Sequence, residues 1–446
     1  MGENHILAAN KYTSMAPPYN GWFKGWVSTY PDEGSYDPTS AWKDFRWVTQ
    51  NPTDSAAAAT AIYSGKKTWN GRISVSPDGS IRYQTITEDA RQRGISVGAV
   101  TSVPISHATP GAWMAHNDSR QNGYAIANEG IWGDPNTTGK ATWPYYGGGH
   151  GITLPPINVL IGGGHPHWYT NQNTYVDEAI LQKLLAENNQ MGKPSFIERV
   201  AGSDGGKDLL NMASNPAVKQ LVGIFGGVTG NIEYRLADGS GANPENPTLA
   251  EMTRAAIEVL NRNPKGFFLL VEGGAIDFAS HRNSMDQMIG EVIDFNQAIQ
   301  AAIDWVNNPS SAANWSNTLI IVTADHETGY LTTAPNVFPN QPLGEISSRT
   351  LQFEKNCVTT CLRASWEDEN GNNEIDSGEN VYWAWNSNGH TNSLVPIYLK
   401  GAIKLDYSAL IRGVDPIRGA YIDNTDIYKI LKAVIANLIY LPLVNR

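Results

Sequence analysis

A run of small residues follows an Asp-Ser pair near the start of the chain. Asp54 and Ser55 precede four alanines and Thr60, and Pro52 lies just upstream. Proline and an Asp or Ser, followed by strong helix formers, predict a helix that begins here. Unpaired backbone N–H groups and the positive end of the helix dipole favour an anion at such a position, so the Ser55 hydroxyl could meet a phosphate. The same pattern also fits an ordinary helix N-cap that has no chemical role.

Carboxylates and histidines follow two apolar, strand-like segments further along the chain. Asp277 and His281 are four residues apart, which places both on one face if the segment is helical and suits a metal ion. Asp325 and His326 are adjacent, and His390 follows a short flexible segment. Each histidine alone also fits a hydrogen-bonded structural role. Because functional groups gather at the carboxyl ends of strands in α/β proteins, the set as a whole favours zinc in a hydrolytic site.

The elements that must position these residues are short apolar strands that alternate with helical patterns. The predicted strands cover residues 95–101, 158–161, 221–225, 267–271, 318–322 and 396–399, and the predicted helices cover 88–93, 178–188, 249–260, 282–306 and 427–436. Residues 11–50 are aromatic and rich in glycine and proline, and are expected to form a loop region. Near-continuous apolar strands between helices predict an α/β fold with a mainly parallel central sheet that is covered by helices on both faces.

Composition and charge narrow the classes of function. The chain has 446 residues, enough for one large domain or two, and its net charge of −11 argues against a nucleic-acid partner. It lacks a stretch of about 20 apolar residues, so no membrane span is expected. Cys357 and Cys361 are compatible with a loop-closing disulfide in an exported protein and equally with two free thiols.

Several motifs together, in the same order along the chain, resemble those of the alkaline phosphatase family. The motifs lie at residues 54–60, 65–71, 106–110, 115–120, 161–164, 248–253, 271–281, 323–328 and 390–391. The resemblance implies a metal-dependent phosphomonoesterase built as a single catalytic domain over residues 1–446, with surface insertions at about 121–156 and 340–388. It also implies a periplasmic or extracellular location, small phosphate monoesters as substrates and a possible homodimer.

The resemblance assigns Ser55 as the nucleophile that is transiently phosphorylated, and Arg120 as a clamp on two phosphate oxygens. The metal ligands that it implies are Asp277, His281 and His390 for one zinc ion, Asp325 and His326 for a second, and Glu272 and Thr109 for a magnesium ion. The first zinc ion would activate water, and the second would lower the pKa of Ser55. Two purely structural alternatives remain, because Thr109 could cap a turn and Arg120 could form an ion pair with Asp118.

Three departures from the family pattern bear on this assignment. The family carries a metal-bridging aspartate just before the residues that resemble Met1 and Gly2, so we expect it upstream of Met1. His107 stands where family members have Asp or His, and an imidazole at this metal site could weaken magnesium or favour zinc. Phe278 takes a position that is often polar. The missing aspartate leaves a non-catalytic phosphate- or metal-binding protein as an alternative, and a phosphodiesterase or sulfatase of the same superfamily is another.

A separate acidic segment resembles an EF-hand calcium loop. Its oxygen-bearing residues are Asp368, Asn370, Asn372, Glu374, Asp376 and Glu379. Asn373 replaces the glycine that usually stands at the sixth position of such a loop. The segment therefore predicts a structural calcium ion, with a solvated acidic loop as the alternative.

Overall fold

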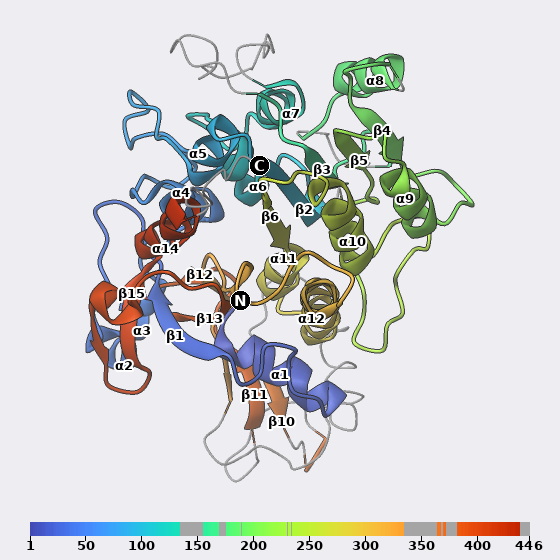
Figure 1. Cartoon of the computed structure of the whole chain (residues 1–446). Coiled ribbons are helices and arrows are strands. Elements are labelled where there is room, and N and C mark those ends of the chain that lie inside the picture. The colour runs from blue at the N-terminus through green and yellow to red at the C-terminus, as the bar shows by residue number, and fades with distance from the viewer. Residues whose placement is uncertain are drawn as a thin grey trace.

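The structure is a computed structural model (Figure 1). It describes residues 1–133, 155–168, 175–188, 190–229, 231–232, 234–333, 364–366, 369–371 and 381–437. Among these residues no helix is both long enough and apolar enough to cross a membrane.

A parallel five-stranded sheet forms the centre of the molecule. Its strands lie in the order β4 (Ser195–Glu198), β5 (Leu221–Ile224), β3 (Val159–Gly163), β2 (Ser96–Pro104) and β6 (Phe267–Glu272). Side chains alternate between its two faces, since Val97 and Ala99 of β2 enter one hydrophobic core and Val100 enters the other. This double burial explains why the strands are almost continuously apolar.

Helices cover both faces of this sheet (Figure 1). One core is closed by α1 (Glu3–Thr13), α9 (Gly205–Ser214), α10 (Leu249–Leu260), α11 (Ala275–His281) and α12 (Met285–Asn307). The other is closed by α4 (Ser55–Ser64), α5 (Ile86–Gln92), α6 (Ala108–Met114), α7 (Gly123–Trp132), α8 (Glu178–Glu187) and α14 (Asn424–Asn437). The predicted α/β fold with a parallel sheet and helices on both faces is confirmed.

A second five-stranded sheet differs from the expectation because it is largely antiparallel. Its order is β14 (Gly413–Asp415), β15 (Gly419–Asp423), β1 (Phe23–Ser28), β13 (Val395–Gly401) and β7 (Leu319–Val322), with β1 and β15 parallel. The prediction that residues 11–50 form a loop region is wrong for β1 and for the short helices α2 (Ser40–Lys43) and α3 (Phe45–Thr49). The sequence does not predict β1, because the exposed residues at its start break the apolar pattern and its partner β13 is remote in sequence.

Smaller elements lie near the carboxyl end of β7. Strands β8 (Glu327–Thr328) and β12 (His390–Thr391) pair antiparallel, so that His390 lies opposite Thr328. Strands β9 (Leu331–Thr333), β10 (Ala364–Trp366) and β11 (Val381–Trp385) form a further antiparallel sheet, and a 3-10 helix covers Tyr407–Leu410. The pairing of β8 with β12 brings together two histidine-bearing segments that are more than sixty residues apart in sequence.

Candidate active site

Helix α4 begins at Ser55, as the sequence predicts. Asp54 is its N-cap, with a carboxylate oxygen that accepts a hydrogen bond from the Ala57 N–H at 2.9 Å, and Gly65 ends the helix in the left-handed conformation at φ 71°. The alanines of α4 are buried and allow close packing of its neighbours. Ser55 is itself only 5% exposed, and its Oγ lies 3.0 Å from His326 Nε2.

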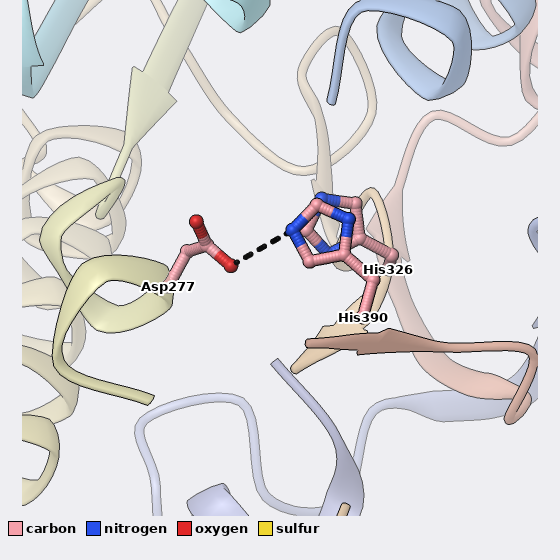
Figure 2. A group of neighbouring side chains, drawn as sticks. All are labelled: Asp277, His326 and His390. Carbon is pink, nitrogen blue, oxygen red and sulfur yellow. Dashed lines mark ion pairs between the residues drawn. The ribbon is translucent and has the colours of Figure 1, made fainter. Parts of the chain in front are cut away.

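A carboxylate and two imidazoles meet at this point (Figure 2). Asp277 comes from α11, His390 from β12 and His326 from the turn that precedes β8, and one ligand atom of each lies within 4.8 Å of the others. The rings of His326 and His390 stack with centroids 3.6 Å apart. Asp277 Oδ1 lies 3.6 Å from His390 Nε2, and the carboxylate points towards the two rings (Figure 2).

His281 completes one face of the cluster. Its Nε2 lies 3.0 Å from His390 Nε2 and 3.4 Å from Asp277 Oδ2. The Nδ1 atoms of His281 and His390 each lie within hydrogen-bond distance of a backbone carbonyl, that of Asn388 at 2.7 Å and that of Thr53 at 2.8 Å. A carbonyl only accepts, so each Nδ1 carries a proton and donates it.

As neutral imidazoles with protonated Nδ1 atoms, His281 and His390 would present two Nε2 lone pairs to each other, which is repulsive unless a proton or a metal ion lies between them. Tetrahedral ligands at the usual zinc distances of 2.0–2.1 Å stand about 3.3 Å apart. The separations of 3.0, 3.4 and 3.6 Å among His281, His390 and Asp277 bracket that value. Burial alone would raise the pKa of Asp277, but the surrounding histidines outweigh it and hold the pKa well below its usual range. The residues therefore fit a divalent metal ion.

A second pair of possible ligands lies beside the serine. Asp325 Oδ2 is 3.1 Å from His326 Nε2, the same nitrogen that faces Ser55 Oγ. His326 Nδ1 lies 3.3 Å from the Thr328 hydroxyl, which donates to Asp277 Oδ1. Thr328 thus links the two groups of ligands and directs the lone pair of His326 Nε2 towards Ser55.

Glu272 and Thr109 form a third group at the end of β6. The Glu272 carboxylate accepts from the Thr101 hydroxyl, and a further hydrogen bond comes from Thr109. Desolvation and the nearby carboxylates outweigh these hydrogen bonds and raise the pKa of Glu272 to about 7. A cation bound here would offset the free-energy cost of burying the ionised Glu272 carboxylate.

Arg120 reaches the site from the segment after α6. Its Nη1 donates to Asp54 Oδ2 at 2.8 Å, and its Nη2 lies 3.0 Å from His107 Nε2. Asp118, the alternative ion-pair partner that the sequence offered for Arg120, instead has its Oδ2 3.9 Å from Arg72 Nη1. Burial, together with the positive charge of Arg120, lowers the pKa of His107 to about 3.

The structure brings Ser55, Asp277, His281, Asp325, His326 and His390 together, and it places Arg120 against Asp54 and His107. Sequence reasoning missed the residues that orient them, namely Thr53, Thr101, Thr328 and Asn388. Two of these act through backbone carbonyls, for which a sequence carries no side-chain signal. Of the predicted calcium loop, Asn370 is exposed, whereas Asp368, Asn372, Glu374, Asp376 and Glu379 lie outside the described residues, as do Cys357 and Cys361.

A buried ionic network supports the segment that ends at Arg120. His116 Nδ1 lies 3.2 Å from Glu129 Oε1, and its Nε2 lies 3.4 Å from Glu88 Oε2. All three side chains are almost completely inaccessible. Burial alone would lower the pKa of His116, but the two carboxylates outweigh it and raise the pKa to about 9. The imidazolium therefore anchors the start of the segment in the folded protein.

This network predicts a pH-dependent stability. The pKa of His116 rises from 6.5 to about 9 on folding, so its stabilisation is complete below pH 6.5 and is lost as the pH rises towards 9. The loss amounts to at most about 3 kcal/mol, at about 1.4 kcal/mol per pH unit. Urea unfolding at pH 6 and pH 9 should show a smaller decrease in the free energy of unfolding for His116→Gln than for wild type. His167→Gln, at an exposed histidine, should behave as wild type, and equal decreases in all three proteins would contradict the assignment.

Comparisons with known proteins agree with this geometry. A family profile described as alkaline phosphatase matches residues 33–437. Alkaline phosphatase 4 of Bacillus subtilis (strain 168) is 30% identical over 443 residues, which cover 92% of this chain and 80% of that protein. The alkaline phosphatase of Escherichia coli (strain K12) is 33% identical over 353 residues, which cover 75% of this chain and 70% of that protein. A variant of the TAB5 alkaline phosphatase, solved with magnesium bound, shares the fold with a TM-score of 0.62 at 21% identity, over 98% of this chain and 95% of that one.

Proposed function

Because the chain belongs to the alkaline phosphatase family and is a phosphatase that acts on phosphate monoesters, we propose that its turnover proceeds through a phosphoserine at Ser55. The observation that carries this proposal is the position of Ser55 Oγ, 3.0 Å from His326 Nε2 beside the cluster of Asp277, His326 and His390. Because His326 Nδ1 donates to the Thr328 hydroxyl, its Nε2 is unprotonated and accepts from the Ser55 hydroxyl, which orients an oxygen lone pair of Ser55 away from the ring. The N-terminus of α4 adds a positive potential at the same point.

Arg120 is proposed to hold the transferred phosphoryl group. A guanidinium has five N–H donors, and Asp54 and His107 take up two of them. Three donors remain for phosphate oxygens, enough for a bidentate contact. Because Asp54 is also the N-cap of α4, one carboxylate fixes both the serine's helix and the arginine.

Metal ions would supply the charge that this reaction needs. We propose one zinc ion at Asp277, His281 and His390, a second at Asp325 and His326, and a magnesium ion at Glu272 and Thr109. When bound, such ions lower the pKa of the attacking oxygens and offset the negative charge of the phosphoryl group. The chain's own contribution is to hold the imidazoles in the tautomer that presents Nε2, through Thr53, Asn388 and Thr328.

Metal removal tests the proposal as a whole. Dialysis against a chelator should abolish hydrolysis of p-nitrophenyl phosphate, and added zinc and magnesium should restore it. The melting temperature should also fall on metal removal, because closely spaced Nε2 atoms and carboxylates then lack the cation that binds the folded state. Hydrolysis of the diester bis(p-nitrophenyl) phosphate serves as the comparison, and should be slower than that of the monoester. Zinc binding without turnover of either ester would instead favour a non-catalytic binding protein.

A further inference from the structure

We propose that Phe45 and Tyr330 contact the leaving group of the substrate and favour phosphate monoesters whose leaving group carries a flat aromatic ring. The inference deepens the proposed function and rests on it. The two rings lie 5.5 Å apart, with their planes tilted by 50°. Phe45 is the first residue of α3 and is 49% exposed, and Tyr330 is half-buried. This aromatic pair joins two segments that are remote in sequence, and both segments border the candidate active site.

Tyr330 is held close to the metal-ligand cluster by its place in the chain. It is two residues after Thr328, whose hydroxyl donates to Asp277 Oδ1, so the Cα atoms of Tyr330 and Thr328 are at most about 7.6 Å apart. The Tyr330 N–H donates to Glu327 Oε2 at 3.2 Å, and the same carboxylate oxygen accepts from the Thr391 hydroxyl. The position of Tyr330 is therefore coupled to both β8 and β12.

Helix α3 brings Phe45 to the same place. Asn392, two residues after His390, donates through its N–H to the Val48 carbonyl at 2.7 Å. Its Nδ2 donates to two further carbonyls near the end of α3, at 3.0 and 2.8 Å. The chain then continues from α3 to Thr53, whose carbonyl accepts from His390 Nδ1. The end of α3 is thus fixed to the strand that carries this metal-ligand candidate.

The backbone of Tyr330 has the left-handed conformation, which an aromatic residue rarely adopts. Its φ is 43°, where glycine or asparagine would fit with less strain. Its carbonyl accepts from Asn386 Nδ2 at 2.9 Å, so hydrogen bonds on both of its peptide groups hold the conformation. Strained residues that their surroundings fix in this way are concentrated at ligand-binding sites. The strain therefore favours a role in binding for the Tyr330 ring.

An aromatic ring in the leaving group would complete the packing of the aromatic pair. Aromatic rings prefer offset-stacked or edge-to-face contacts with centroids roughly 4.5–7 Å apart, and the exposed part of Phe45 can offer such a contact. A nucleobase stacks on phenylalanine or tyrosine in the same way. A leaving group without a ring, such as glycerol, makes no such contact. The aromatic pair should therefore affect the choice between esters, and phosphoryl transfer itself depends on the residues around Ser55.

The test compares kcat/KM for an ester that carries a ring with kcat/KM for glycerol 2-phosphate, which carries none. Phe45→Ala and Tyr330→Asn should each lower this ratio about fivefold, which equals about 1 kcal/mol. The two ring-bearing esters are phenyl phosphate and adenosine 5′-monophosphate. A decrease for either one supports the inference, and the ester affected shows whether the pair meets a ring next to the phosphoryl group or one beyond a sugar. Because asparagine suits the left-handed backbone, Tyr330→Asn should leave the melting temperature close to that of wild type.

Two further variants show whether the aromatic ring and its position cause the effect. Tyr330→Phe keeps the ring and should keep the ratio within about twofold of wild type. Phe23→Ala removes a phenylalanine that is 45% exposed and packs 4.6 Å from the ring of Tyr407, much as Phe45 packs on Tyr330. Phe23 pairs with Leu399 in the half of β13 that is further from His390. This control should leave the ratio unchanged.

Calorimetry with benzylphosphonate, a ring-bearing analogue that cannot be hydrolysed as an ester, gives a readout that does not depend on turnover. In Phe45→Ala its dissociation constant should rise about fivefold relative to that of inorganic phosphate. Equal losses for esters with and without a ring, or unchanged ratios for both ring-bearing esters, would overturn the inference. Wild-type protein that hydrolyses none of the three esters would overturn the proposed function instead. Thermal unfolding identifies a variant that does not fold, and Phe45→Ala, at an exposed side chain, then decides.

Discussion

Replacing Ser55 with alanine is expected to lower kcat for p-nitrophenyl phosphate by at least about a thousandfold, or about 4 kcal/mol of activation free energy. The substitution removes the one oxygen that lies at the N-terminus of α4 and faces His326 Nε2 at 3.0 Å. The ligands around Asp277 and His390 keep their positions, so zinc content and phosphate affinity should change little. Steady-state kinetics, metal analysis and calorimetry with phosphate measure the three quantities on one preparation.

Ser64→Ala is the matched control for this variant. Ser64 is the last residue of the same helix, is equally buried and donates its hydroxyl hydrogen to the Thr60 carbonyl. It should leave turnover within about twofold of wild type, as expected for a residue outside the site. Rapid turnover by the Ser55 variant with intact metal content would show that this hydroxyl is not the nucleophile.

Asp277→Asn is expected to remove one bound zinc ion and to lower kcat/KM by at least about a hundredfold. Loss of a residue that binds the metal directly should lower metal affinity and activity at least as much as loss of a residue that only orients such a ligand. The change keeps the shape of the side chain but removes the negative charge that faces His281 and His390 at 3.4 and 3.6 Å. It also weakens the hydrogen bond from the Thr328 hydroxyl, which connects this group to His326.

Metal analysis and activity should change together in this variant. Asp304→Asn, at an exposed aspartate on α12, provides the control and should retain both zinc content and activity. High zinc concentrations should restore part of the activity of Asp277→Asn, because the two imidazoles remain. A variant with full zinc content but no activity would remove Asp277 from the metal ligands and assign it another role.

The sequence predicts much of the site because its chemistry lies in side chains at the ends of strands. Asp277 and His281 are four residues apart and fall on one turn of α11, and Asp325 and His326 lie three and four residues after the end of β7. The spacing along the sequence is therefore enough to predict that the two residues of each pair lie close together. The meeting of these pairs with Ser55 and His390 depends on contacts between remote segments, and the expectation that they meet came from the family resemblance.

Other features could not be predicted because they involve backbone atoms or remote pairing. The carbonyls of Thr53 and Asn388, which fix the tautomers of His390 and His281, could come from any residue type. Strand β1 pairs with β13, more than three hundred residues away, and its exposed start and four consecutive buried residues do not show the alternation typical of a half-buried strand. The contact between His107 and Arg120 was missed for another reason, since a histidine beside Thr109 suggests a metal ligand before it suggests a hydrogen-bond acceptor.

Anomalous diffraction at the zinc edge, from crystals of the zinc- and magnesium-loaded protein, tests the central claim most directly. The claim is that the serine at position 55 and ligands from four separate segments enclose divalent metal ions in one site. It predicts two strong peaks, one bounded by Asp277, His281 and His390 and one beside Asp325 and His326, both adjacent to Ser55 Oγ. Peaks elsewhere, or none within coordination distance of these atoms, would contradict it.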